Sequence, residues 1–159
     1  MRRRVVIIGA LLVAVLGLAG CTAAGGAPAS SGGPPSPQVL AGQSLAQREF
    51  GLLAGGDFGG AWDLWAAPAQ QVLDRSSYVA LNTQCRPALG EPYTITSVRP
   101  DSATVLTVYW RHGQQTGTSS VIYQGNRWWF APGAADLADY RLGVPALVAK
   151  RKAAGQCHT

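Results

Sequence analysis

A change of hydrophobic period at Gly90 constrains the fold more than any other feature of this sequence. Before Gly90, apolar residues recur every three or four positions, as they do on one face of an α-helix. After Gly90, apolar and polar residues alternate, which is the pattern of a half-buried β-strand. The 159 residues are enough for one domain of moderate size. We therefore expect helices followed by an antiparallel sheet, which is the α+β class.

Three amphipathic segments predict helices. The first begins near Gln38 and ends at Gly55-Gly56, with an apolar face formed by Val39, Ala46, Phe50 and Leu53. The second follows Asp57, which is placed to cap it, and carries Phe58, Ala61, Trp62 and Trp65 at helical spacing. The third starts at Ser76 or Ser77 and carries Tyr78, Leu81, Asn82 and Cys85 on one side.

Four strands are predicted after Gly90. They cover 93–99, 103–112, 118–124 and 127–131, and they are separated by Pro100-Asp101-Ser102, by 113–117 and by the tight turn Gly125-Asn126. Consecutive strands with short connections indicate an antiparallel meander. Helices that precede such a meander are expected to cover one face of a bent sheet.

The run Phe50–Trp62 resembles the opening of nuclear transport factor 2-like domains, in which a long helix, a Gly-Asp break and a short helix with Ala and Trp follow one another. Residues 77–81 and 125–130 also look like members found in actinobacterial lipoproteins, and the resemblance covers about residues 38–140. It implies a cystatin-like cone, with about three helices packed on a four-stranded sheet and a pocket between them. It implies no single activity, because such folds host isomerases, hydrolases, dehydratases and binding modules.

The N-terminal residues resemble a bacterial lipoprotein signal. Arg2, Arg3 and Arg4 precede an apolar run from Val5 to Ala19, which is shorter than the roughly 20 residues of a spanning helix. The run ends in Leu18-Ala19-Gly20-Cys21, which looks like a lipobox. On this resemblance, residues 1–20 are a signal peptide and Cys21 is the diacylated first residue of a protein anchored to the extracytoplasmic face of the cell membrane. An ordinary secretory signal and an uncleaved anchor are the alternatives.

The remaining boundaries follow from composition and cysteine count. Residues 22–37 are only Ala, Gly, Ser, Thr and Pro. With Cys21 they predict a flexible tether over 21–37, which is followed by a domain over 38–149 and a basic tail over 150–159. Cys85 and Cys157 remain as an even pair, which predicts a disulfide in an oxidising compartment, with two free thiols as the alternative. No Cys or His spacing suits a metal, and no cofactor is expected.

The net charge of +5 does not indicate nucleic-acid binding. Three basic residues lie in the signal and three more are Lys150, Arg151 and Lys152, whereas 39–149 holds seven Arg against all eight acidic residues. The domain is therefore close to neutral, and a nucleic-acid partner is not expected. The basic tail either stays solvated or touches anionic lipid headgroups.

No catalytic motif is present in the sequence: there is no nucleophile elbow, P-loop or GxGxxG. Side chains that a cone enzyme could use are Asp57, Asp63, Asp101, Tyr93, Tyr109, Tyr123, His112 and, in the tail, His158. Asp57 and Asp101 are explained more simply as a helix cap and a turn residue, Asp63 as solvated, and His112 as a surface residue. Aromatic residues are the better candidates for contacts with a ligand or partner, and we name Trp62, Trp65, Tyr78, Tyr109, Trp110, Trp128 and Trp129.

We therefore expect a non-catalytic module that holds a small apolar ligand or binds an envelope protein, with a homodimer through the sheet as a further arrangement. The alternative is a small hydrolase or isomerase that uses the cone. A ligand-binding domain predicts an open cavity, and an interaction module predicts a filled cone with an exposed aromatic patch. An enzyme predicts a buried carboxylate or His that faces the cavity.

Overall fold

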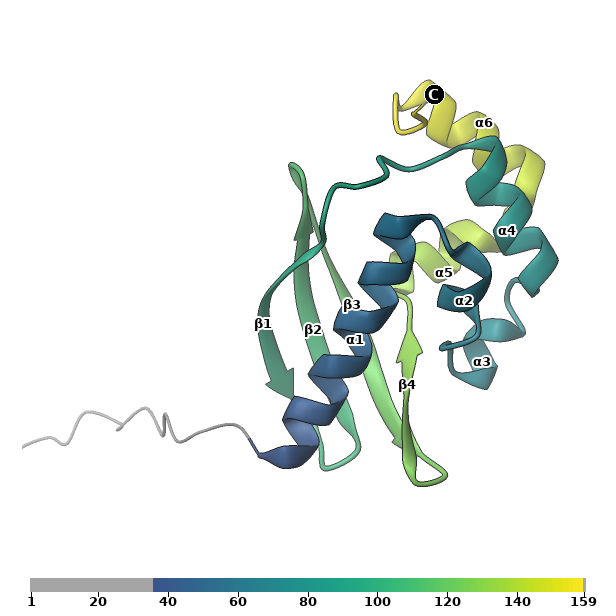
Figure 1. The fold of residues 1–159 in the computed structure, drawn as a ribbon. Helices are drawn as coiled ribbons and strands as arrows, with labels where there is room; N and C mark the ends of the chain where they lie inside the picture. The colour runs from purple at the N-terminus through teal and green to yellow at the C-terminus, as the bar shows by residue number, and fades with distance from the viewer. Residues whose placement is uncertain (1–35, 159) are drawn as a thin grey trace, which may run out of the picture. The chain divides into compact units, whose positions relative to one another are not determined.

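The computed structural model describes residues 36–158, which form an α+β fold with a four-stranded antiparallel sheet (Figure 1). In chain order, the elements are α1 (Pro37–Gly55), α2 (Phe58–Trp62), α3 (Ala67–Gln70), α4 (Arg75–Gln84), β1 (Thr94–Pro100), β2 (Val105–His112), β3 (Gln115–Gln124), β4 (Arg127–Ala131), α5 (Ala134–Tyr140) and α6 (Val144–Ala153). Within the described residues, four helical segments precede the sheet, one of them only four residues long, where the sequence analysis expected about three.

Local capping explains where the first helices begin and end. The hydroxyl of Ser36 accepts a hydrogen bond from the N–H of Val39, and Gly56 ends α1 in the left-handed conformation, with φ of 82°. The carboxylate of Asp57 accepts from the N–H of Gly60 at 2.8 Å, so the predicted cap of α2 is confirmed. Helix α4 begins earlier than predicted, because Asp74 caps it by accepting from the N–H of Ser77 at 2.9 Å.

The strands pair in the order β1-β2-β3-β4, as expected for a meander. Val108 lies opposite Val98 on one side and Ser119 on the other, and Val121 lies opposite Phe130. A bulge between Ile95 and Ser97 interrupts the β1–β2 register. The β3–β4 turn has positive φ at both Gly125 and Asn126, which suits a two-residue hairpin.

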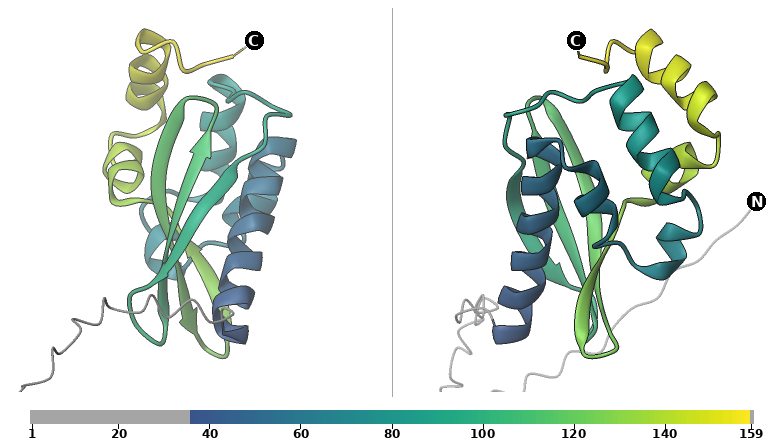
Figure 2. Two further views of the ribbon diagram at one scale, coloured as in Figure 1. Left: turned by 90° about the vertical axis from the view of Figure 1, so that its left-hand side faces the viewer. Right: turned by 45° about the vertical axis from the view of Figure 1, so that its right-hand side comes forward.

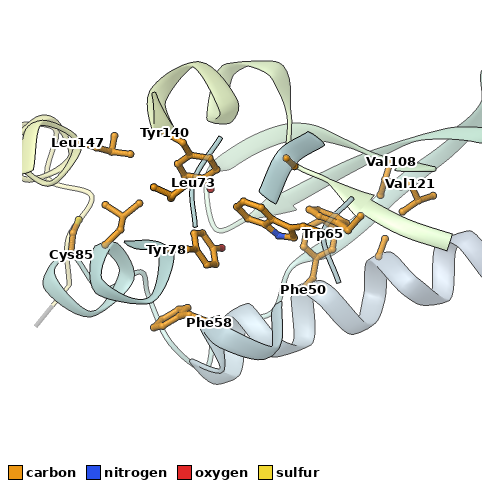
Figure 3. Close-up of a cluster of buried hydrophobic side chains, with 14 of the residues drawn as sticks. Phe50, Phe58, Trp65, Leu73, Tyr78, Cys85, Val108, Val121, Tyr140 and Leu147 are labelled. Carbon is orange, nitrogen blue, oxygen red and sulfur yellow. The ribbon is translucent and has the colours of Figure 1, made fainter. Parts of the chain in front are cut away.

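Helix α1 crosses the face of the sheet that forms the core (Figure 2). Gly42 permits this close approach, since a Cβ atom there would lie 2.5 Å from Cδ1 of Leu106. The core continues from Val108 and Val121 on the sheet to Trp65, to Tyr78 on α4 and to Tyr140 on α5 (Figure 3). Burial of this continuous cluster stabilises the placement of every element around it.

A short extended segment adds to the β4 edge of the sheet. The N–H of Ala66 donates to the carbonyl oxygen of Phe130 at 2.7 Å, and the N–H of Phe130 donates to the carbonyl oxygen of Leu64 at 2.8 Å. Trp65 thereby forms a parallel bridge with Phe130. This bridge fixes the buried indole of Trp65 between the sheet and the helices.

Helix α6 is a departure from the sequence analysis, which placed Lys150, Arg151 and Lys152 in a tail. These residues form the last turn of α6, which packs along α4 through the buried side chains of Leu147 and Val148. Three cations in the last turn also oppose the negative end of the helix dipole. The basic residues therefore belong to an ordered helix.

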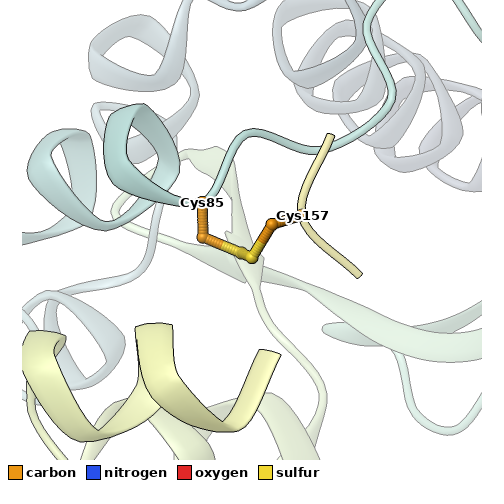
Figure 4. Close-up of a disulfide and its surroundings, with 2 residues drawn as sticks. All are labelled: Cys85 and Cys157. Atoms are coloured by element: carbon orange, nitrogen blue, oxygen red, sulfur yellow. A yellow bond between two sulfur atoms is a disulfide. The ribbon is translucent and has the colours of Figure 1, made fainter. Parts of the chain in front are cut away.

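The predicted disulfide between Cys85 and Cys157 is present (Figure 4). It joins the end of α4 to the segment after α6, with a Cα–Cα distance of 4.6 Å and a sequence separation of 72 residues. Beside it, the N–H of His158 donates to the carbonyl oxygen of Arg86 at 2.7 Å. The bridge and this hydrogen bond together hold residues 156–158 against the domain.

Candidate functional site

A cavity of about 460 Å³ is bounded by α1, α4, α5, α6 and the adjoining end of the sheet. Aromatic rings form much of its wall: Phe50, Trp65, Tyr78, Tyr93, Trp110, Phe130 and Tyr140. Polar and charged side chains also line it, including Glu49, Asn82, Glu91, His112, Ser119, Asp136, Asp139, Arg151 and His158. Aromatic walls with a few convergent polar groups are typical of a small-ligand site.

Glu49 is the most unusual of these residues, because it is a carboxyl group on the buried face of α1 with no exposed surface. Its Oε1 accepts a hydrogen bond from Nε1 of Trp65 at 3.0 Å, and its Oε2 has no protein partner. Burial raises the pKa of Glu49 from 4.5 to about 8, although the Trp65 hydrogen bond acts in the opposite direction. At neutral pH, Glu49 is therefore mainly an uncharged acid that can donate as well as accept a hydrogen bond.

Three stacked rings form one wall of the cavity. Tyr93 lies between Phe50, at 4.9 Å and an interplanar angle of 8°, and His112, at 4.1 Å and 5°. The buried Nε2 of His112 has no hydrogen-bond partner and lies 3.9 Å from Oε2 of Glu91. This wall thus holds a second unpartnered polar atom.

Trp65, Tyr78 and Tyr140 form a second aromatic group, on the helical side of the cavity (Figure 3). The ring of Trp65 lies 4.6 Å from that of Tyr78 and 5.6 Å from that of Tyr140. Burial raises the pKa of Tyr78 and of Tyr140 well above the ordinary phenol value. Burial also raises the pKa of Tyr93 to about 12, so all three phenols stay uncharged at physiological pH.

Charged groups of α5 and α6 complete the lining. Burial raises the pKa of Asp136, and the nearby Arg151 acts in the opposite direction. Asp139 is paired through its Oδ1 with Nζ of Lys150 at 2.6 Å. Arg151, which the sequence analysis assigned to a tail, is thus part of the lining.

The structure brings three of the seven predicted aromatic contact residues to the cavity: Trp65, Tyr78 and Trp110. Nε1 of Trp110 donates to Oγ of Ser119 at 3.1 Å. Trp62 instead links α2 to the segment before α4, since its Nε1 donates to the carbonyl oxygen of Leu73 at 2.8 Å. None of the other predicted contact residues lines the cavity.

Those other residues are divided between the two faces of the sheet. The adjacent Trp128 and Trp129 point to opposite sides, as alternation along a strand requires. Trp128 packs against the core, with its ring 5.3 Å from that of Tyr123, and the guanidinium of Arg127 lies 3.3 Å from the ring centroid of Trp129. Tyr109 has a similar partner in Arg99, at 5.9 Å.

The predicted titratable candidates separate in the same way. Tyr93, His112 and His158 line the cavity, and His112 is buried rather than at the surface. Asp57 is a helix cap, and Asp63 forms an exposed ion pair with Arg75 at 2.9 Å. Asp101 lies in the β1–β2 turn, where it accepts hydrogen bonds from Arg99 and Thr107, and Tyr123 is exposed.

Glu49 was missed by the sequence analysis, although a signal for it exists. It lies three residues after Ala46 and four before Leu53, so it falls on the apolar face of the first predicted helix. A carboxylate on an apolar helix face is either a local irregularity or a functional group. Only the structure adds that this face borders a cavity.

Two searches of the described residues found nothing. Within residues 36–158, no three His, Cys, Asp or Glu side chains are grouped so as to hold a metal ion. In the same range, no helix combines the length and the apolar character required to cross a membrane. The expected signal, the lipobox with Cys21 and most of the tether lie outside the described residues.

The chain matches no known protein-family model, and comparison with curated proteins finds no similar sequence.

Proposed function

We propose that this protein is a membrane-anchored extracytoplasmic lipoprotein whose nuclear transport factor 2-like domain binds a small ligand in the cavity beside Glu49. The observation that carries the ligand-binding part is the pair of unpartnered polar atoms, Oε2 of Glu49 and Nε2 of His112, which belong to residues lining the same cavity. Buried polar atoms in folded proteins normally have a hydrogen-bond partner. A ligand with polar groups and an apolar body would supply both partners and cover the aromatic walls.

The anchoring part of the proposal is supported by the sequence. Leu18-Ala19-Gly20-Cys21 follows a basic and then an apolar segment, which is the order of a lipoprotein signal. The disulfide between Cys85 and Cys157 is also typical of proteins that fold in an oxidising compartment. A diacylglyceryl group on Cys21 would hold the domain near the outer surface of the cell membrane.

A small hydrolase or isomerase is the second candidate function, and one observation favours it. Glu49 is a buried carboxyl group that lines the cavity, and its pKa of about 8 lies near the pH at which most enzymes act. A general acid or base is most effective when its pKa is close to the working pH. An enzyme would use the same cavity, so identifying the bound molecule tests both candidate functions.

We expect native mass spectrometry of the full chain, extracted from membranes in detergent, to show a mass excess that is lost on denaturation. A ligand held in the cavity stays bound only while the domain is folded, so its mass disappears on denaturation. An adduct on the surface does not depend on folding, so its mass should remain. The adjacent residues Trp110 and Tyr109 provide a matched pair, because only Trp110 lines the cavity. Trp110→Ala should lose the excess mass and Tyr109→Ala should keep it, while an unliganded wild-type mass would argue against a tightly held ligand.

Replacement of Cys21 by Ser tests the anchor. Serine offers no thiol for lipid attachment, so we expect Cys21→Ser to move from the membrane fraction to the soluble extracytoplasmic fraction. Cys85→Ser is the matched control, because it replaces a cysteine that is bonded to Cys157 and is not expected to carry lipid, so the protein should stay in the membrane fraction. Membrane retention of Cys21→Ser would exclude the lipid anchor as the means of attachment.

A further inference from the structure

We propose that the ligand of this cavity is an organic cation, an ammonium group carried on a compact apolar body. The inference rests on the proposed small-ligand function and names the ligand class. It follows from three features of the lining: an excess of carboxyl groups, a buried carboxyl oxygen without a partner, and aromatic walls.

The charges that line the cavity are predominantly acidic. Four residues with carboxyl groups line it: Glu49, Glu91, Asp136 and Asp139. Among the described residues, Arg151 is the one lysine or arginine that lines the cavity with them. Lys150, from outside the lining, offsets only Asp139. While Glu49 is uncharged, Glu91, Asp136 and Asp139 oppose Arg151 and Lys150, which leaves one net negative charge. This charge favours a cationic ligand over an anionic one, most strongly where the wall excludes water.

Glu49 gives the cation a place to bind. The Oε2 atom of Glu49 accepts no hydrogen bond from the protein, and Glu49 has no exposed surface. An ionised Glu49 would therefore lack both a counter-ion and hydration. An ammonium group that approached Oε2 would supply the missing charge. Binding would then convert the acid to a carboxylate, and the proton would pass to the solvent.

The aromatic residues around Glu49 suit the rest of such a ligand. Trp65 donates to its other oxygen, and Tyr78 and Tyr140 pack on Trp65. Aromatic rings attract the partly positive methyl or methylene groups of an organic ammonium and also exclude water from it. A hydrated inorganic cation would gain little from these walls.

Every titratable group around the cavity must be considered in a pH test. Tyr78, Tyr93 and Tyr140 stay neutral below pH 9 because their pKa values are raised. His112 and His158 also line the cavity. The histidine contribution must therefore be separated from that of Glu49.

Choline and 3,3-dimethyl-1-butanol form the central comparison, because they have nearly the same shape and only choline is charged at every pH. The full chain in detergent is titrated with each compound, and the fluorescence of Trp65 and Trp110 in the lining reports binding. We expect choline to bind at least about tenfold more tightly than the neutral compound. As the pH increases toward 8, the affinity for choline should rise by up to about tenfold per pH unit, because Glu49 becomes easier to ionise.

Glu49→Gln identifies the group responsible. The amide keeps the shape of the side chain and an oxygen for Trp65, so we expect this variant to fold, to bind choline at least about tenfold more weakly than wild type, and to lose the rise in affinity between pH 7 and 8. Asp63→Asn removes an exposed carboxylate outside the cavity and should bind choline as wild type does.

Three results would overturn the inference: equal affinity for choline and the neutral compound, a choline affinity unchanged in Glu49→Gln, or no binding of either compound. Equal binding of both would leave the ligand-binding function standing, since the cavity would then be shown to hold a neutral molecule. If neither binds, the mass measurement decides separately whether the cavity holds a ligand of another class.

Discussion

Glu49→Gln will keep nearly constant stability between pH 5 and 9, whereas the wild-type protein will lose about 4 kcal/mol of unfolding free energy over the same range. The pKa of Glu49 is about 8 in the folded protein and 4.5 in an exposed state. Between these values, the folded protein holds a proton that the unfolded chain releases. A rise in pH therefore favours unfolding, and the stability contributed by the neutral acid is lost progressively until about pH 8.

Denaturant unfolding followed by tryptophan fluorescence at several pH values measures this difference. Asp136 also has a pKa raised by burial and is retained in the variant, so a small slope of the same sign should remain. Asp63→Asn is the control and should follow wild type, because that carboxylate is half exposed and paired on the surface. A wild-type protein with the same stability at pH 5 and 9 would contradict the burial of an unpaired carboxyl group.

Reduction of the Cys85–Cys157 disulfide is expected to lower the free energy of unfolding by about 4 kcal/mol, on the chain-entropy estimate for a loop of this length. The oxidised bridge restricts the unfolded chain, so its loss raises the entropy of the unfolded state. Reduction should also free residues 156–158, because they are held by the bridge and by the hydrogen bond from His158 to Arg86. Gln156 and His158 line the cavity, so ligand affinity should fall as well.

Unfolding with and without reductant measures the stability difference. The double variant Cys85→Ser/Cys157→Ser is the matched control, because reductant should leave its midpoint unchanged. It should also unfold at a lower denaturant concentration than the oxidised wild type. Equal midpoints for the oxidised and reduced wild-type protein would show that the loop closure adds no net stability.

Local patterns were sufficient to predict the order of the four strands, although β3 begins at Gln115, inside the predicted loop. The second predicted helix was too long, because α2 ends at Trp62 and Trp65 forms the extended bridge to Phe130 instead. Alternating residues fix which side chains of β2 face the core, and Gly125-Asn126 specifies the last hairpin. Helix α6 was missed because its basic residues suggested a tail, and because its few apolar residues are buried only through packing against α4. The overlooked signal for this helix in the sequence was Pro145, because proline is common in the first turn of a helix.

The candidate site could be predicted only in part because it is assembled from distant residues. Trp65, Tyr78 and Trp110 were named as aromatic candidates, but nothing local distinguishes them from Trp62 or Tyr109, which lie elsewhere. Each of these rings has an apolar face and a polar atom, so composition alone cannot tell a packed ring from a lining one. Glu49 needed the tertiary structure most, since its raised pKa comes from burial by other segments.

The hydrogen bonds that attach Leu64–Ala66 to β4 also bear on how copies of this protein behave when crowded. An uncovered sheet edge is a template on which a strand of another molecule can pair and start an aggregate. Here Leu64–Ala66 covers part of one edge, and the other edge strand carries a bulge, the charged Arg99 and the non-donating Pro100. Both borders of the sheet therefore oppose growth from one molecule to the next, which lets many copies remain separate and folded at high local concentration.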